Sequence, residues 1–198
     1  MNSTPISIAH ATLLAPYGLN ESAIESVFSE ILTHDADYAD LYFQYSRSEG
    51  WSLEEGHVKS GSFNIDQGVG VRVVSGEKTA FAYSDDISHA ALSSAAAATR
   101  SIARAGGNAK AAKSQSKSGR ALYTPTDPVS SFEDADKVRI LERLEQFARN
   151  IDPRVKEVMG RLSGEYDVVM VARSDGVMAA DVRPLVHIGL TVIAEQNG

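Results

Sequence analysis

The sequence predicts an α+β domain with a largely antiparallel, twisted sheet of about eight strands and three main helices packed on it. Three observations predict this class. Some segments have apolar residues at helical spacing, and others have an apolar residue at every second position. The segments come in blocks, in the order helix, strands, helices, strands. Glycine-containing turns separate the strand-like segments.

The composition is that of an ordinary globular chain and argues against several functions. Nineteen basic and 26 acidic residues give a net charge of −7, which disfavours a nucleic-acid partner. No cysteine is present, so disulfides and thiolate ligands are excluded. No apolar run is long enough to span a membrane, and the first residues lack the features of a secretory signal. We therefore expect a cytoplasmic location and no membrane contact.

Residues 1–37 are expected to form a helical lead-in, and residues 38–84 are expected to form strands. Asn20 is a good N-cap, and one apolar stripe at helical spacing follows it, formed by Ile24, Val27, Phe28, Ile31 and Leu32. From Tyr38 the period changes to two, as is typical of a strand. Further short strands are expected around 51–53 and 58–65.

Residues 67–84 allow two interpretations. Gly68, Gly70 and Gly76 could open a phosphate-binding loop, which requires a helix to begin directly after the glycines. Instead, alternating valines begin at Val69, Gly76 fits a tight turn, and a second alternating segment follows. The pattern therefore favours a β-hairpin.

Residues 85–150 are expected to be helical, apart from a mobile basic loop at 106–120. An alanine-rich helix is expected over about 88–105, capped by Asp85, Asp86 or Ser88. Ser130 and Glu133 have the spacing of a capping box and predict the start of the next helix.

Residues 154–195 are expected to form antiparallel strands. The segment 166–172 is apolar on both faces, as a central strand is. Asp175-Gly176 predicts a type I′ hairpin turn. The final strand carries an apolar stripe and resembles a buried strand running into a further turn, so we expect the chain to continue beyond Gly198 in a longer parent.

No residue of the chain forms a convincing catalytic or metal centre. The five histidines (His10, His34, His57, His89 and His187) lie far apart in the sequence. The densest group of ligand-type residues, His34, Asp35 and Asp37, is more typical of a helix end followed by a solvated turn. His187 is expected to be an ordinary histidine on a sheet face.

Other reactive residue types have simpler interpretations. Ser62 and Ser174 lie in turn sequences and lack a nucleophile elbow. Asp181 and Arg183 share a strand face, where an ion pair is favoured over a substrate carboxylate site. Glu54, Glu55 and Glu157 are expected to be solvated. The basic stretch 100–120 has no interleaved aromatic residues for base stacking, so a solvated loop is favoured over an anion or nucleic-acid site.

Four motifs together resemble the amino-terminal part of the TldD/PmbA family, and they resemble its TldD branch most closely. They are Y-A-D-L-Y-F-Q at 38–44, G-V-G-V-R-V at 68–73, F-A-Y-S-D-D at 81–86 and S-D-G at 174–176. The resemblance implies a cytosolic zinc metallopeptidase that works with a PmbA/TldE-like partner. It also implies removal of leader peptides and degradation of small unfolded polypeptides.

The resemblance assigns no catalytic, cofactor-binding or metal residue within 1–198. The family's metal motif, H-E-x-x-x-H with a later cysteine, belongs to a second domain, and nothing in this chain matches it. We therefore expect residues 1–198 to be the N-terminal domain, to form a wall of the substrate chamber and part of the subunit interface, and to leave the zinc to the absent C-terminal domain. The alternative is a non-enzymatic interaction module that uses exposed strand edges.

Overall fold

The computed structural model describes residues 4–32, 36–99, 110–117 and 122–197, and it confirms the α+β class. The described residues form four α-helices and six strands: α1 Pro5–Ala9, α2 Glu21–Leu32, β1 Tyr38–Glu54, β2 His57–Ser75, β3 Lys78–Ser84, α3 His89–Thr99, β4 Gln115–Ser116, α4 Asp134–Ile151, β5 Val155–Arg173 and β6 Val177–Ala194. A π-helical turn at His10–Leu14 and a 3₁₀ turn at Ala15–Tyr17 follow α1. None of the described helices is long and apolar enough to cross a membrane.

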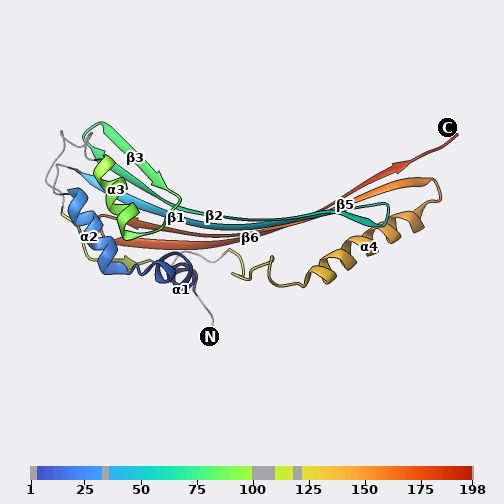
Figure 1. The fold of residues 1–198 in the computed structure, drawn as a ribbon, viewed down its shortest axis with the longest axis horizontal. Helices are drawn as coiled ribbons and strands as arrows, with labels where there is room; N and C mark the ends of the chain where they lie inside the picture. The colour runs from blue at the N-terminus through green and yellow to red at the C-terminus, as the bar shows by residue number, and fades with distance from the viewer. Residues whose placement is uncertain (1–3, 33–35, 100–109, 118–121, 198) are drawn as a thin grey trace. The chain divides into compact units, whose positions relative to one another are not determined.

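The strands form one mixed sheet in the order β3-β2-β1-β5-β6-β4 (Figure 1). β2 and β3 pair antiparallel, with Val69 opposite Ser84 and Ser75 opposite Lys78, so the predicted hairpin is confirmed. β4 pairs parallel with β6 at Val177 and Met178. The expected central strand at 166–172 lies within β5, which has neighbours on both sides.

The chain divides into two compact units, each built from three separate segments. Unit 1 comprises residues 1–46, 66–123 and 167–182, and unit 2 comprises residues 47–65, 124–166 and 183–198. In unit 1, α3 packs against β3 and α2 packs against α3 (Figure 1). In unit 2, α4 packs on β5, where the Leu141 side chain lies over Gly160.

Each unit has an apolar interior formed by the stripes that the sequence predicts. In unit 1, α2 buries its complete helical stripe, formed by Ile24, Val27, Phe28, Ile31 and Leu32. In unit 2, a smaller cluster holds Leu53, Leu141 and Leu162, with Trp51 packed against it. Burial of apolar side chains is the main favourable term in folding, so these stripes fix which face of each element points inward.

The strand number was wrong because glycines and a proline inside long strands resembled strand ends. β1, β2, β5 and β6 each join two segments that were expected to be separate strands. Gly50, Gly68 and Gly164 all lie in strand interiors, where a missing side chain permits close approach of neighbouring atoms. Pro184 lies in β6 beyond the two residues that pair with β4, at a sheet edge where proline is tolerated. The fourth helix is α1, which is part of the expected lead-in.

Two of the predicted helix N-caps are confirmed, and one predicted capping box is wrong. Asn20 accepts the amide of Ala23 at 2.9 Å and Ser88 accepts the amide of Ala91 at 3.1 Å, so both cap as predicted. Ser130 and Glu133 do not form a capping box: α4 begins at Asp134 without a side-chain cap. The Ser130 hydroxyl instead donates to the Asp127 carboxylate at 2.9 Å, because Asp127 also accepts the amide of Val129 and organises this turn.

The hairpin between β5 and β6 was predicted correctly, but its turn type was not. The loop has three residues, Ser174 to Gly176, and only Gly176 has a positive φ, at 87°. Three-residue hairpins need one left-handed residue, whereas a type I′ turn needs two. The left-handed pair that a type I′ turn requires instead occurs at Glu55-Gly56, between β1 and β2.

Of the stretch expected as a mobile loop, only residues 110–117 are described. There the Gln115 amide donates to the Gly176 carbonyl and the Lys117 amide donates to the Met178 carbonyl, which attaches β4 to β6. The final strand exists, but its apolar residues are exposed rather than buried: Leu185, Val186, Ile188, Leu190, Val192 and Ile193 are all at least 39% exposed.

Candidate functional site

The best-formed candidate site is a hollow of about 290 Å³ on the open face of unit 1, which we call the aromatic groove. It is lined by residues from three neighbouring strands: Tyr42 and Gln44 on β1, Gly68 and Gly70 on β2, and Phe81 and Tyr83 on β3. Residues two apart in a strand point to the same face, so these side chains share one face of the sheet. The opposite face carries the buried residues, including Leu41, Phe43, Val69 and Val71.

The groove exists because β2, the middle strand, has two glycines on this face. A side chain at Gly68 would collide with the backbone, since its Cβ would lie 2.7 Å from the Ser84 carbonyl oxygen. At Gly70, the Cβ would lie 3.0 Å from the Phe81 ring. The glycines that resembled a phosphate loop therefore serve strand packing, and at Gly70 the missing side chain makes room for the Phe81 ring of β3.

The groove combines exposed aromatic rings with acidic groups. Phe81 is 65% exposed and Tyr83 is 76% exposed, and their rings stack with centroids 6.4 Å apart. Asp66 and Asp85 also line the groove, and among the described residues none of those that line it is Lys, Arg or His. Large exposed aromatic surface beside polar groups is typical of a binding surface rather than of a scaffold face.

On the same sheet, a charged cluster surrounds Tyr38. The Arg72 Nε donates to the Asp40 carboxylate at 2.8 Å, and the Arg72 and Arg173 guanidinium carbons lie 6.0 and 5.6 Å from the Tyr38 ring centroid. Burial, together with the nearby Asp40 carboxylate, raises the pKa of Tyr38. The hydrogen bond to Asp40 raises the pKa of Arg72. Tyr38 is thus a neutral phenol beside the ion pair of Arg72 and Asp40.

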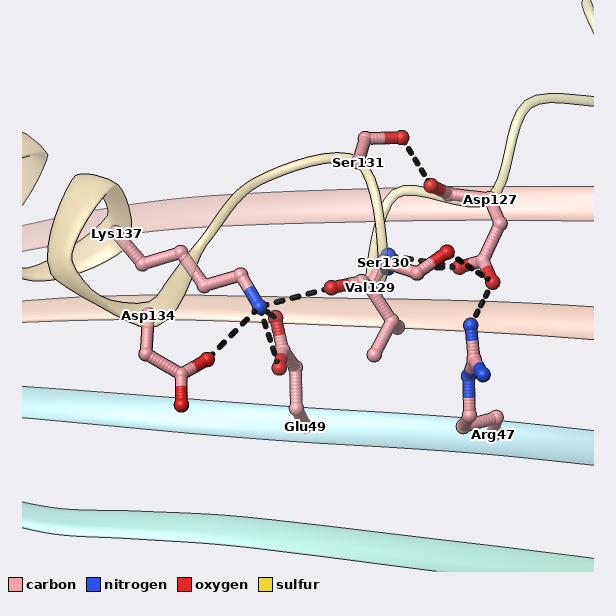
Figure 2. A network of polar contacts seen from close by, with 8 residues as sticks. All are labelled: Arg47, Glu49, Asp127, Val129, Ser130, Ser131, Asp134 and Lys137. Carbon is pink, nitrogen blue, oxygen red and sulfur yellow. Dashed lines mark hydrogen bonds and ion pairs between the residues drawn. The ribbon is translucent and has the colours of Figure 1, made fainter.

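Unit 2 contains a second polar site, centred on Lys137 (Figure 2). The Lys137 side chain is 5% exposed, and its ammonium donates to Glu49 at 2.8 Å and to the Val129 carbonyl at 2.8 Å. Asp134 lies 3.5 Å from the same ammonium. A buried charge requires this degree of compensation, so the cluster fixes the start of α4 against β1.

Next to Lys137, the turn at 127–131 is held to β1 by an ion pair between Arg47 and Asp127 (Figure 2). Arg47 borders a hollow of about 540 Å³, which Trp51, Phe63 and Phe132 also line. Within the described part of the chain, the Arg47 Nε and Trp51 Nε1 atoms are buried without a hydrogen-bond partner. Burial raises the pKa of Tyr166, and the positive charge of nearby Arg47 acts in the opposite direction. The arrangement combines paired charges with aromatic side chains.

The structure does not bring the ligand-type residues together. Across the described ranges, no three His, Asp or Glu side chains lie close enough to hold a metal ion. His34 and Asp35 lie outside the described residues, and Asp37 accepts the amide of Gly76 at 2.6 Å. His57, His89 and His187 are exposed.

The remaining candidate catalytic residues make structural contacts or are exposed to solvent. The Ser174 hydroxyl oxygen accepts the amide of Ala39 at 3.0 Å, and Ser174 is buried, so it stabilises β1 next to the turn. Glu55 lies in the β1–β2 turn, and Glu157 is exposed on β5. The Asp181 carboxylate accepts the amide of Val182 at 3.0 Å.

Sequence reasoning missed the aromatic groove. Phe81 and Tyr83 were recognised only as alternating strand residues. Two signals in the sequence were available. Phe81 and Tyr83 alternate with Ala80 and Ala82, which indicates that the alanine face is packed and the aromatic face is open, and Gly68 and Gly70 are two apart on the preceding strand.

The fold is of the α+β class with a mixed sheet, and comparison with known proteins defines the class of protein further. The family model described as "PmbA/TldA metallopeptidase domain 1" matches residues 39–103. The model described as "PmbA/TldA metallopeptidase central domain" matches residues 127–198. The chain belongs to the PmbA/TldD family of metallopeptidases.

Curated relatives agree with this assignment. A protein named "Metalloprotease TldD homolog" from Haemophilus influenzae is 41% identical over 94% of this chain and 39% of its own length. A protein of the same name from Buchnera aphidicola subsp. Schizaphis graminum is 36% identical over 98% of this chain and 40% of its own length. The chain thus spans about two fifths of the length of these relatives.

Solved structures share the fold. A proposed modulator of a DNA gyrase from Thermotoga maritima superposes with a TM-score of 0.72 at 13% identity, covering 90% of this chain and 40% of that one. TldE from Thermococcus kodakarensis superposes with a TM-score of 0.63 at 16% identity, covering 88% of this chain and 40% of that one.

Proposed function

We propose that this chain provides substrate-contacting and assembly surfaces of a TldD-type zinc metallopeptidase. The observation that carries the proposal is the 41% identity to a protein named as a TldD metalloprotease over 94% of the chain. The whole enzyme would act in the cytoplasm with a PmbA/TldE-like partner, removing leader peptides and degrading small unfolded polypeptides. Residues 1–198 would form its N-terminal domain.

Two surfaces support separate roles within this proposal. The open face of unit 1, with its aromatic groove, suits a chamber wall that contacts extended peptides. In unit 2, six apolar side chains of β6 and three of β2 (Val58, Phe63 and Ile65) are at least 39% exposed. Apolar surface of this extent is usually covered in an assembly, which suits a subunit interface.

The described residues do not fit a zinc site, because their His, Asp and Glu side chains form no converging set of donors. In the proposed enzyme, zinc would be held in the part of the relatives that this chain does not match. There it would activate a water molecule for peptide hydrolysis. The role left to this chain is positioning and access, since a wall beside the metal excludes folded proteins by size.

The test is a peptidase assay on the intact protein with its partner subunit, using one protein substrate in two forms. The reduced, carboxymethylated form is unfolded, and the native form is the matched control. We expect cleavage of the unfolded form only, loss of activity with a chelator and recovery with zinc. Equal cleavage of both forms, or activity that chelation leaves unchanged, would contradict the proposal.

A second function, a non-enzymatic interaction module, is favoured by one observation. β4 pairs with β6 only at Val177 and Met178, so in the described chain the rest of β6 forms a sheet edge. Such an edge can accept a strand from a partner. Partner binding by an intact protein that shows no metal-dependent peptidase activity would select this alternative.

A further inference from the structure

We propose that the aromatic groove of unit 1 binds a lysine or arginine side chain of an extended, unfolded peptide. The proposal rests on the function proposed above and adds a substrate preference to it. The juxtaposition that carries it is three exposed aromatic rings and two carboxylates over the glycine-bearing β2, and none of the described lining residues is basic.

The shape of the groove suits a long, thin side chain. Tyr42 rises from β1, and Phe81 and Tyr83 rise from β3, on either side of the glycine-bearing β2. The Phe81 ring reaches over Gly70, 3.0 Å from where a Cβ would stand, so the hollow of about 290 Å³ lies beside this ring. The four-carbon stem of lysine, or the stem of arginine, can lie along ring surfaces while its charged end reaches the rim.

The chemistry of the groove suits a cation. Tyrosine and phenylalanine rings attract ammonium and guanidinium groups through their negative faces. Asp66 and Asp85 add negative charge to the same lining. A purely apolar side chain would gain no electrostatic attraction from these carboxylates, and an anionic side chain would be repelled by them.

Arg72 on β2 is already paired with a carboxylate. It lies opposite Phe81 in the β2–β3 register, and its guanidinium is bound to Asp40, with contacts of 2.8 Å and 2.5 Å. Arg72 and Asp40 together carry no net charge, so Arg72 adds no net positive charge beside the groove.

The experiment compares two unstructured ten-residue peptides that differ at one position, lysine in one and norleucine in the other. Norleucine keeps the aliphatic stem and removes the charge. Binding to the intact protein is measured by fluorescence anisotropy at low salt, with a chelator present to prevent turnover. We expect the lysine peptide to bind about 5-fold more tightly.

Two variants locate this preference in the groove. Asp85→Asn and Tyr83→Leu should each weaken binding of the lysine peptide about 2–5-fold and leave the norleucine peptide less affected. Glu77→Gln and Tyr123→Leu are the matched controls, since both residues are exposed in unit 1 and neither lines the groove. The controls should bind both peptides as the unsubstituted protein does.

Equal affinity for the two peptides would overturn the inference, as would an unchanged lysine preference in both groove variants. This failure is distinguishable from failure of the proposed function. If both peptides are cleaved equally well in the presence of zinc, the peptidase stands and the groove preference falls. If neither peptide is cleaved but lysine-selective binding is lost in the variants, the groove preference stands and the peptidase falls.

Discussion

Lys137 carries a positive charge into a region of unit 2 that water scarcely reaches, since its side chain is 5% exposed and that of Glu49 is 9% exposed. Such a pair is tolerated in the interior of the protein only because each charge compensates the other. Removing one partner leaves a buried charge without compensation, which is more costly than losing the attraction alone.

We therefore expect Lys137→Met to lower the free energy of unfolding by about 3 kcal/mol or more. The measurement is urea denaturation followed by circular dichroism. Arg139→Met is the matched control, because Arg139 forms an exposed pair with Asp136 on the same helix, and its loss should cost about 1 kcal/mol or less. A Lys137 variant as stable as the Arg139 variant would show that the Glu49 contact contributes little.

At the scale of single residues, the sequence shows charges but not their pairing. Lys137 and Glu49 are 88 positions apart, and nothing in the local pattern of either predicts the contact. The ion pair between Arg47 and Asp127 could likewise not be predicted from the sequence. Capping by Asn20 and Ser88 was predictable because a cap bonds to amides three residues away.

Among the elements, the β5–β6 hairpin depends most closely on one glycine. Gly176 has φ of 87°, and a Cβ there would lie 2.2 Å from the Lys113 carbonyl oxygen of the segment that leads into β4. The substitution therefore meets both backbone strain and a steric clash with a neighbouring chain segment.

Gly176→Ala should lower the free energy of unfolding by about 2–3 kcal/mol, from strain plus displacement of the β4 segment. Gly18→Ala is the control: Gly18 also has a positive φ, of 67°, but its Cβ would meet nothing within 4 Å. That variant should cost about 1 kcal/mol. Equal losses in chemical denaturation would mean that the contact with Lys113 is not retained in solution.

The end of α4 provides a pH-dependent element. Arg154 donates to both oxygens of the Asp152 carboxylate, at 3.0 and 2.7 Å, and its backbone amide donates at 2.9 Å. The side-chain hydrogen bond and then the backbone bond lower the pKa of Asp152 from 3.8 to about 2. Because the folded pKa is the lower one, the resulting stabilisation is present above about pH 3.8 and is lost as the pH falls towards 2.

We expect a carboxyl ¹³C NMR titration to place the Asp152 pKa near 2 and Arg154→Gln to move it upward, towards 3.8. Arg139→Gln, on an exposed arginine elsewhere on α4, should leave the Asp152 titration unchanged. A pKa near 3.8 in the unsubstituted protein would indicate that Arg154 does not hold this geometry in solution.

For the molecule as a whole, the fold class, the β2–β3 hairpin and α2 were predictable because they depend on periodicities within short windows. The lengths of β1, β2, β5 and β6 were not, because a glycine or proline inside a strand looks the same in sequence as one that ends it. The tertiary contacts that distinguish the two cases, such as Gly68 against the Ser84 carbonyl, come from other strands.

The candidate site was predictable only in part, for a related reason. The alternation of aromatic residues with Ala80 and Ala82 placed Phe81 and Tyr83 on one face, but Tyr42 reaches that face through the pairing of β1 with β2. A groove built across three strands has no signature in any one of them. The family resemblance was detectable because its motifs are continuous segments.

Residues 104–126 separate the two family-model matches, yet β1 in the first match is the sheet neighbour of β5 in the second. Both compact units draw residues from both matches. Cutting the chain at that junction would leave two halves, each with a long unpaired strand edge that is prone to aggregation. The regions matched by the family models and the compact units are thus different divisions of this polypeptide.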